Sequence, residues 1–283
     1  MRVEEAMTPR SELVTATVPG SREDVLRILQ ERSFSSVPIV RETEDGDVFR
    51  GLISRERLIE EPDEEQISML LEAVEPIHPS ASIGELANHM LETGARRVPV
   101  VDGGLSGIIT ITDVVAAIAG GAVDVDATVG SVAGRAVHTV FEETPILAAE
   151  RSIYYGDVNY AVVIDAAGDM TGIVTEADIV DVAEVVEGEE GTGDSIANQD
   201  SEWAWEGIKG VGNRMLPTRN VEFPDDPVAT IMSDDVVTIS RRRTVAEAAQ
   251  EMVRHDVEQV PVIAGGKLAG ILCDMHLLEA FDG

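Results

Sequence analysis

The sequence predicts an α/β protein of the α+β kind, built from four tandem β-α-β-β-α repeats that pair into two modules. A strand-like run of Val, Pro and other apolar residues occurs four times. Each time a short turn leads to a glycine, two apolar residues and a polar residue that opens a helix. The four glycines are Gly51, Gly107, Gly172 and Gly270. Repetition of this kind places binding sites in the clefts between repeats.

Each repeat starts with a short extended stretch, expected over residues 13–18, 75–78, 136–141 and 236–240. A helix with apolar residues spaced near 3.6 follows, most clearly over 83–91 and 245–253. Ser82 with Glu85, and Thr244 with Glu247, have the spacing of a capping box at these helix starts. The two strands that follow are apolar at nearly every position, which predicts burial on both faces. A second helix closes the unit.

These patterns place repeat one at residues 1–62, repeat two at 68–122, repeat three at 128–187 and repeat four at 227–283. The motif glycines are separated by 56, 65 and 98 residues, so the last step contains an insertion, residues 188–226. The insertion holds both tryptophans, Trp203 and Trp205, and a stretch with Lys209, Arg214 and Arg219 but no acid. This composition suggests docking onto a partner surface.

The charge is extreme, because 21 basic and 53 acidic residues give a net charge of −32. Few aromatic residues, few lysines and many carboxylates resemble the proteins of salt-loving archaea. We expect the fold to require salt, since a Debye length of about 3 Å at 1 M salt screens the repulsion between carboxylates. The same charge argues against binding of nucleic acid, which depends on basic patches.

The remaining composition favours a cytoplasmic protein without catalytic chemistry. Cys273 is the single cysteine, so no internal disulfide forms. No apolar run approaches the ~18 residues of a membrane span, and the first residues do not begin a secretion signal. The five histidines show no metal-ligand spacing, and no nucleophile lies beside a base. We therefore expect no metal, no catalytic residue and no enzymatic activity.

The repeated motif resembles the CBS domain family, and the resemblance covers nearly the whole chain outside the insertion. CBS repeats work in pairs called Bateman modules, which implies modules at residues 1 to about 122 and about 123 to 283. Four repeats with an insertion between the third and fourth look like archaeal relatives of the gamma subunit of AMP-activated protein kinase. This resemblance implies an adenine nucleotide as regulatory ligand rather than catalytic cofactor, and a protein partner or a homodimer.

A nucleotide-binding CBS cleft has the signature Gly-apolar-apolar-Thr/Ser-x-x-Asp, in which the Asp holds the two ribose hydroxyls. Repeat two keeps it with Thr110 and Asp113, and repeat three with Thr175 and Asp178. A carboxylate accepts two hydrogen bonds from a cis-diol. A Thr-x-x-Asp pair also caps a helix, so ribose contact and pure capping both remain open.

The other two repeats depart from the signature. Repeat one has Arg57 in place of the Asp, and repeat four has His276 there, with Cys273 in place of the Thr. His276 would pair with a phosphate when protonated, or simply cap its helix. These departures put ligand binding by repeats one and four in doubt.

In family members, phosphate-binding cations come from the residue before the Val-Pro strand of the opposite repeat. Repeat two has Arg96 and Arg97 there; with Arg57 they would hold a phosphate-rich anion or face solvent. Ser36 takes this place opposite Asp113, which resembles the family's tight, less exchangeable site.

The adenine side of a cleft would lie near the ends of the first strands, at Thr17 and Ser240. Three arginines follow Ser240, namely Arg241, Arg242 and Arg243. They would supply positive charge to the cleft of repeat three, where the opposite Glu258 and Gln259 do not suit a phosphate. The alternative is a salt-bridged, exposed loop.

Three functions fit these patterns. The first is a regulatory, energy-sensing protein that binds AMP, ADP or ATP between repeats and modulates a partner. The second is binding of S-adenosylmethionine or a related adenosyl compound, because neither signature Asp has a phosphate-binding Arg beside it. The third is a scaffold with empty clefts whose residues 203–221 hold a protein partner. The ligand, its phosphate count, the partner and the oligomeric state are left open by the sequence.

Overall fold

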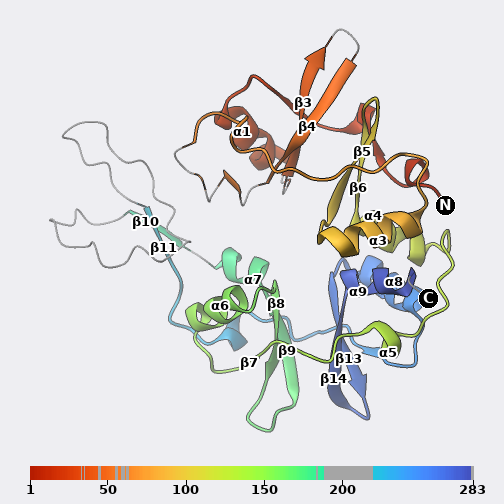
Figure 1. Ribbon diagram of the computed structural model, residues 1–283. Helices are drawn as coiled ribbons and strands as arrows, with labels where there is room; N and C mark the ends of the chain where they lie inside the picture. The colour runs from red at the N-terminus through yellow and green to blue at the C-terminus, as the bar shows by residue number, and fades with distance from the viewer. Residues whose placement is uncertain are drawn as a thin grey trace. The chain divides into compact units, whose positions relative to one another are not determined.

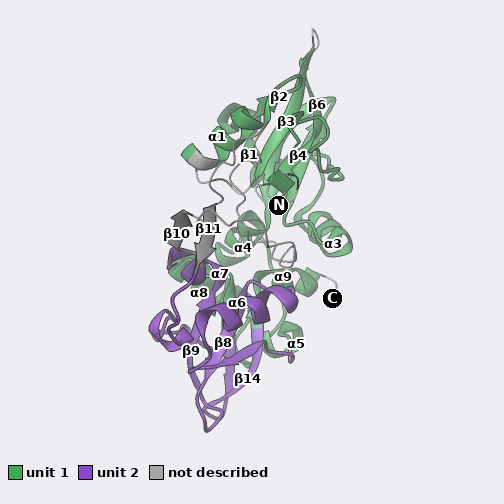
Figure 2. Ribbon diagram, turned by 90° about the vertical axis from the view of Figure 1, so that its left-hand side faces the viewer, with its two compact units in different colours: residues 1–134, 239–260, 272–283 green, residues 135–238, 261–271 purple. Residues whose placement is uncertain are grey.

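The computed structural model describes residues 1–32, 34, 36–43, 46–54, 57–58, 61, 64–182, 184–187 and 219–281 (Figure 1). They form two compact units, shown in Figure 2. Unit 1 contains residues 1–134, 239–260 and 272–283, and unit 2 contains residues 135–238 and 261–271. Most of the predicted insertion, including Trp203, Trp205, Lys209 and Arg214, lies outside the described residues.

Repeats three and four follow the predicted β-α-β-β-α order. In repeat two an isolated parallel bridge between Ile77 and Val100 takes the place of the first strand, and in repeat one residues 57–58 are the part of the closing helix that the structure describes. Repeat one contains η1 (Val3–Glu5), β1 (Thr8–Pro9), η2 (Arg10–Glu12), β2 (Ala16–Thr17), α1 (Arg22–Arg32), β3 (Ser36–Thr43) and β4 (Gly46–Ser54). Repeat two contains α3 (Ile83–Thr93), β5 (Arg97–Asp102), β6 (Gly104–Thr110) and α4 (Ile111–Ala119).

Repeat three contains α5 (Val129–Val132), β7 (Thr139–Phe141), α6 (Ile146–Tyr155), β8 (Tyr160–Ile164), β9 (Met170–Thr175) and α7 (Glu176–Asp181). Next, β10 (Glu184–Glu187) pairs antiparallel with β11 (Arg219–Glu222). Repeat four contains η3 (Val228–Thr230), β12 (Ile239–Ser240), α8 (Val245–His255), β13 (Gln259–Ala264), β14 (Lys267–Cys273), α9 (Asp274–Leu278) and η4 (Glu279–Phe281).

The strands form small sheets, and the two strands of each hairpin differ in how deeply they are buried. Three sheets follow the order first strand, hairpin strand, hairpin strand: β2-β3-β4, β7-β8-β9 and β12-β13-β14. The first hairpin strand is buried on both faces, as expected, with Val98 and Val100 fully buried in β5. The second hairpin strand differs in β6, where buried and half-buried residues alternate, because one face is less covered.

The helices begin where the sequence predicts. At α3, Ser82 Oγ accepts the Glu85 amide at 3.2 Å, and Glu85 Oε2 accepts the Ser82 amide at 2.7 Å. Thr244 and Glu247 form the same reciprocal pair at α8. These capping boxes satisfy amides that the first helical turn leaves without partners.

Strands exchanged between repeats explain the motif glycines. β1 does not join the sheet of its own repeat but pairs antiparallel with β6 of repeat two. A Cβ at Gly107 would lie 2.5 Å from the Thr8 carbonyl oxygen and 2.8 Å from Met7 Sδ, so only glycine fits. In repeat three, a Cβ at Gly172 would meet the Ser233 carbonyl oxygen at 2.8 Å.

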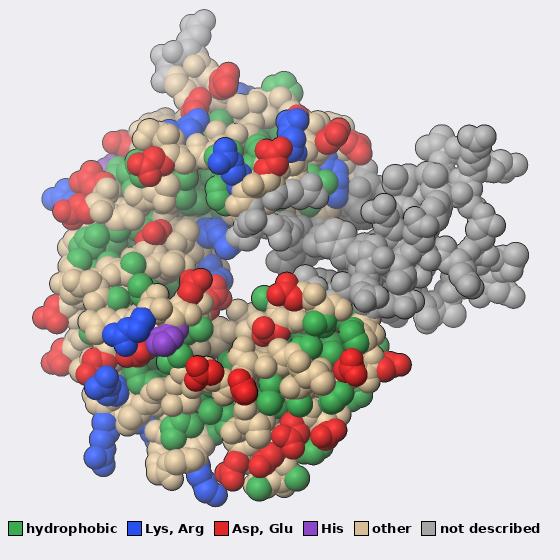
Figure 3. All heavy atoms as spheres, turned by 180° about the vertical axis from the view of Figure 1, so that it is seen from behind, with side chains coloured by type: hydrophobic (Ala, Val, Ile, Leu, Met, Phe, Trp, Pro, Cys, Tyr) green, Lys and Arg blue, Asp and Glu red, His purple; other side chains and the backbone are tan. Residues whose placement is uncertain are grey.

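Unit 1 contains elements from more than one pair of repeats. The helices of repeat four belong to unit 1, because α8 packs on α4 and α9 packs on both α3 and α4 (Figure 1). The charge is visible in Figure 3, where Asp and Glu side chains are spread over the face shown. Within the part of the chain that the structure describes, no helix is long and apolar enough to cross a membrane.

Candidate ligand sites at the closing helices

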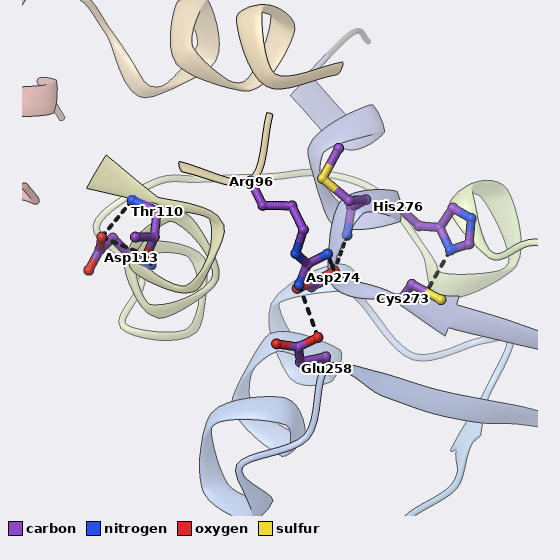
Figure 4. A network of polar contacts seen from close by, with 8 residues as sticks. Arg96, Thr110, Asp113, Glu258, Cys273, Asp274 and His276 are labelled. Carbon is purple, nitrogen blue, oxygen red and sulfur yellow. Dashed lines mark hydrogen bonds and ion pairs between the residues drawn. The ribbon is translucent and has the colours of Figure 1, made fainter. Parts of the chain in front are cut away.

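The signature pair of repeat two lies where β6 ends and α4 begins. Asp113 Oδ2 accepts hydrogen bonds from the Thr110 amide and from Thr110 Oγ1, both at 2.8 Å (Figure 4). The Asp113 amide donates to Thr110 Oγ1 at 3.4 Å. One carboxylate oxygen therefore makes both capping contacts. The other, Oδ1, has no hydrogen-bond partner among the described residues and can accept from a ligand.

Repeat three has the same arrangement in unit 2. Asp178 Oδ2 accepts from the Thr175 amide at 2.8 Å and from Thr175 Oγ1 at 2.7 Å. The Asp178 amide donates back to Thr175 Oγ1 at 3.4 Å. Capping and an available second oxygen thus occur together in both repeats, so the capping interpretation does not exclude ribose contact.

The junction at the end of repeat one contains a carboxylate, supplied from the start of repeat two, that the sequence analysis missed. Ser54 takes the place of the Thr, and its hydroxyl accepts the Arg57 amide at 3.0 Å. Glu72, which follows repeat one, accepts the Ser54 amide on Oε2 and the Ser54 hydroxyl on Oε1, both at 3.0 Å. Glu72 replaces the missing Asp as a capping acid, but each of its oxygens is already bonded. The Arg57 side chain pairs with Glu61 at 3.6 Å.

Repeat four caps its closing helix with a histidine. His276 Nδ1 accepts the Cys273 amide at 3.0 Å, so the imidazole takes the place of a carboxylate (Figure 4). Of the two roles considered for His276, capping is the one that this contact supports. A neutral ring nitrogen accepts this bond, whereas a protonated ring would lose it.

Arg96 of repeat two is bound to two acids of repeat four. Its NH1 and NH2 groups donate to Asp274 Oδ1 at 3.0 Å and Oδ2 at 2.6 Å, and NH2 also donates to Glu258 Oε2 at 3.0 Å. Figure 4 shows the side chain directed toward these acids rather than toward Asp113. Burial works against the charged form of Arg96, but the hydrogen bonds to Asp274 and the two acidic charges outweigh it and raise the pKa of Arg96.

Arg97 and Ser36 have unsatisfied groups in unit 1. Burial, and then the positive charge of Arg96, lower the pKa of Arg97. No ion pair connects Arg97 to another described residue. The Ser36 hydroxyl is buried and likewise lacks a hydrogen-bond partner within the described ranges. Buried polar groups nearly always have a partner, so the Ser36 hydroxyl suits a bound ligand or water. Arg97 is half-buried and suits a bound anion.

Of the three arginines of repeat four, Arg241 and Arg243 accept backbone hydrogen bonds from α5 in unit 1. The Arg241 carbonyl accepts the Gly130 amide at 2.9 Å, and Arg243 pairs with Glu247 at 2.9 Å. The Arg242 amide lies 3.4 Å from the Ser240 hydroxyl. Thr17 ends β2 as an exposed residue.

The repeats and their exchanged strands define a tandem-repeat α/β protein with a capped strand-to-helix junction in every repeat. The sequence pattern of the CBS domain matches residues 3–64, 70–120, 129–184 and 228–283. The chain belongs to the CBS domain family.

Similar proteins include archaeal ones. An uncharacterised protein of Methanocaldococcus jannaschii is 25% identical over 279 residues, which is 98% of this chain but 61% of that protein. The chain therefore spans about three fifths of that relative. A crystal structure of an uncharacterised conserved protein from Pyrococcus horikoshii is 28% identical, with a TM-score of 0.70 over 99% of this chain and 100% of that one.

A second structure supports the fold. It is a Methanocaldococcus jannaschii protein described as an archaeal homologue of the gamma subunit of AMP-activated protein kinase. It is 18% identical, with a TM-score of 0.66, and the match covers 99% of this chain and 100% of that one. The predicted resemblance to archaeal four-repeat CBS proteins is confirmed.

Proposed function

We propose that the chain is a regulatory protein that binds adenine nucleotides at the junctions of Asp113 and Asp178. The observation that carries the proposal is the oxygen that each carboxylate keeps available. In both repeats Oδ2 makes the capping bonds and Oδ1 has no partner among the described residues. A charge-assisted hydrogen bond to such an oxygen contributes about 1.5–3 kcal/mol.

The orphan groups in unit 1 support an anionic ligand. Arg97 brings a half-buried positive charge into a chain with a net charge of −32. Its position in β5 lies directly opposite Thr110 of β6, and opposite residues of an antiparallel pair share one face of the sheet. A ligand with a ribose at Asp113 and a phosphate near Arg97 would satisfy both groups.

Binding of S-adenosylmethionine is the second candidate, and the contacts of Arg96 favour it. Asp274 and Glu258 occupy this guanidinium, and of the arginine pair only Arg97 forms no ion pair with a described residue. An adenosyl compound without phosphates needs the ribose contact but no arginine. Competition by S-adenosylmethionine and not by ATP would favour this ligand.

The test is a calorimetric titration of the full chain in molar KCl with AMP, ATP and S-adenosylmethionine. Asp113→Ala and Asp178→Ala should each remove one binding event. Asp235→Ala, which removes an exposed carboxylate away from the junctions, is the matched control and should remove none. Binding that survives both substitutions would assign the Thr-x-x-Asp pairs to capping alone. No binding of any adenosyl compound would favour the scaffold.

The proposal includes a biological setting. The protein would have an energy-sensing, non-catalytic role in the cytoplasm of a halophile. It would act with a protein partner or with a second copy of this chain. The salt requirement can be tested directly. With 53 acidic and 21 basic residues, the melting temperature should rise between dilute buffer and molar KCl. An unchanged melting temperature would contradict the halophilic assignment.

A further inference from the structure

One residue joins the starts of two closing helices in unit 1. The Arg96 carbonyl accepts the amide of Ile111, the first residue of α4, at 2.9 Å. Its side chain binds Asp274, the first residue of α9, through two hydrogen bonds (Figure 4). Arg96 therefore connects the helix that carries Asp113 with repeat four.

The two carboxylates that bind Arg96 differ in burial and in the number of contacts they make with it. The side chain of Asp274 is 7% exposed, and its Oδ1 also accepts the Met275 amide at 2.7 Å. The side chain of Glu258 is 54% exposed and meets Arg96 through one oxygen. An exposed ion pair contributes little because water and salt screen it. Glu258 is thus the partner that another anion replaces most easily.

Arg97 provides a place for such an anion. It is adjacent to Arg96. Burial and then the charge of Arg96 lower the pKa of Arg97, while the charge of Glu258 raises it, and no described residue forms an ion pair with Arg97. A guanidinium group has five donors in a plane and suits the oxygens of a phosphate. An anion between the two arginines would reduce their mutual repulsion and would lie beside the Thr110–Asp113 junction.

We propose that Arg96 is a switch between the contact of repeats two and four and the phosphate of a bound ligand. This rests on the proposed nucleotide binding at Asp113. A phosphate held by Arg97 competes with Glu258 for Arg96. As Arg96 turns to the phosphate, the link between the starts of α4 and α9 weakens. The ligand then has different affinities for two arrangements of these repeats, which is the physical requirement for regulation.

The experiment compares AMP with adenosine by calorimetry, so that the ratio of their dissociation constants measures the phosphate contribution. In Glu258→Gln the dissociation constant of adenosine divided by that of AMP should be about twofold to fivefold larger than in the wild type. In Arg97→Gln the preference for AMP should disappear. Glu251→Gln makes the same charge change on α8, where Glu251 pairs with Arg254 at 2.9 Å, and should leave the ratio unchanged.

A second background separates the switch from a general charge effect. Arg96→Gln combined with Asp274→Asn removes the arginine and its buried acid together, so that no buried charge is left unpaired. In this background Glu258→Gln should alter the ratio less than in the wild type, because only the effect of its charge on Arg97 remains. A rise of equal size in both backgrounds would overturn the switch, as would an unchanged ratio in Glu258→Gln alone.

The two proposals fail in different ways. If AMP and adenosine bind the wild type equally well, nucleoside binding stands and the switch is overturned. If neither binds, the nucleotide proposal fails, and pyrophosphate becomes the probe for the arginine pair. Stabilisation by pyrophosphate that is larger in Glu258→Gln and absent in Arg97→Gln would keep the switch. No effect of pyrophosphate on any variant would overturn it.

Discussion

Repeats one and two have the same strand-to-helix junction but obtain its carboxylate from different places. In repeat two, Asp113 lies in the closing helix and uses one oxygen for both donors of Thr110. In repeat one, Glu72 comes from the segment that leads into repeat two and uses one oxygen for each donor of Ser54. Loss of the motif Asp therefore does not remove the acid from the junction. In repeat one, however, neither carboxylate oxygen is left without a hydrogen bond.

The largest effect should appear in nucleotide binding. Asp113→Ala should weaken binding at the repeat-two junction by about 10–100-fold, because one or two charge-assisted hydrogen bonds are lost. Glu72→Ala should leave nucleotide affinity unchanged, since both Glu72 oxygens serve Ser54. Calorimetry of both variants beside wild type measures the difference. Equal losses of affinity would show that both carboxylates contribute to nucleotide binding.

A smaller effect should appear in stability, where the two junctions behave alike. Glu72→Ala and Asp113→Ala each remove a capping acid, so each should lower the free energy of unfolding by about 1–2 kcal/mol. Chemical denaturation in molar KCl gives the values, with Glu75→Ala as the control for loss of an exposed acid in the same segment. If Glu72→Ala matches the Glu75→Ala control, the Glu72 contacts are not stabilising.

The smallest effect extends the comparison to the first helices of repeats three and four. Counted from the helix start, Glu150 of α6 occupies the position of Ala249 in α8, and both are buried. Burial raises the pKa of Glu150 above its usual 4.5 and outweighs the opposing charge of Arg151, whose Nε lies 3.3 Å from Oε2. Neither carboxylate oxygen accepts a hydrogen bond from a described residue. The charged form is therefore the unfavourable one in the fold.

Glu150→Gln should thus raise the free energy of unfolding at neutral pH by about 1 kcal/mol. A raised folded-state pKa gives stability that is complete below pH 4.5 and is lost as pH rises through the folded pKa. The gain should shrink when melting is measured toward pH 4.5, while Glu143→Gln, on the exposed turn before α6, should show no such trend. A gain independent of pH would rule out ionisation as its cause.

Local patterns in the sequence were sufficient to predict the repeats, most of their element order and the helix caps. Ser82 with Glu85 and Thr110 with Asp113 are three residues apart, so a single helical turn determines their geometry. The family signature likewise marked the two junctions whose carboxylates keep an available oxygen. These features depend on neighbours within one turn or one hairpin.

Contacts between repeats were not predictable in the same way. Glu72 lies 18 residues from Ser54, and Asp274 lies 178 residues from Arg96. No periodicity links such positions, because packing of separate repeats decides which side chains meet. The capping contact of His276 was one of two alternatives, and the ring nitrogen that accepts the Cys273 amide favours it. The roles of Arg96, Arg97 and Arg241–Arg243 toward a ligand stay predictions.

The exchanged strand β1 makes the repeats poor units for dissection. It is supplied by repeat one, yet its hydrogen bonds extend the sheet of repeat two, where Gly107 provides the space for it. Damage to the first nine residues is thus transmitted to a sheet whose other strands begin at Arg97 and Gly104. A fragment that contains repeat two without residues 8–9 would therefore lack one strand of its sheet.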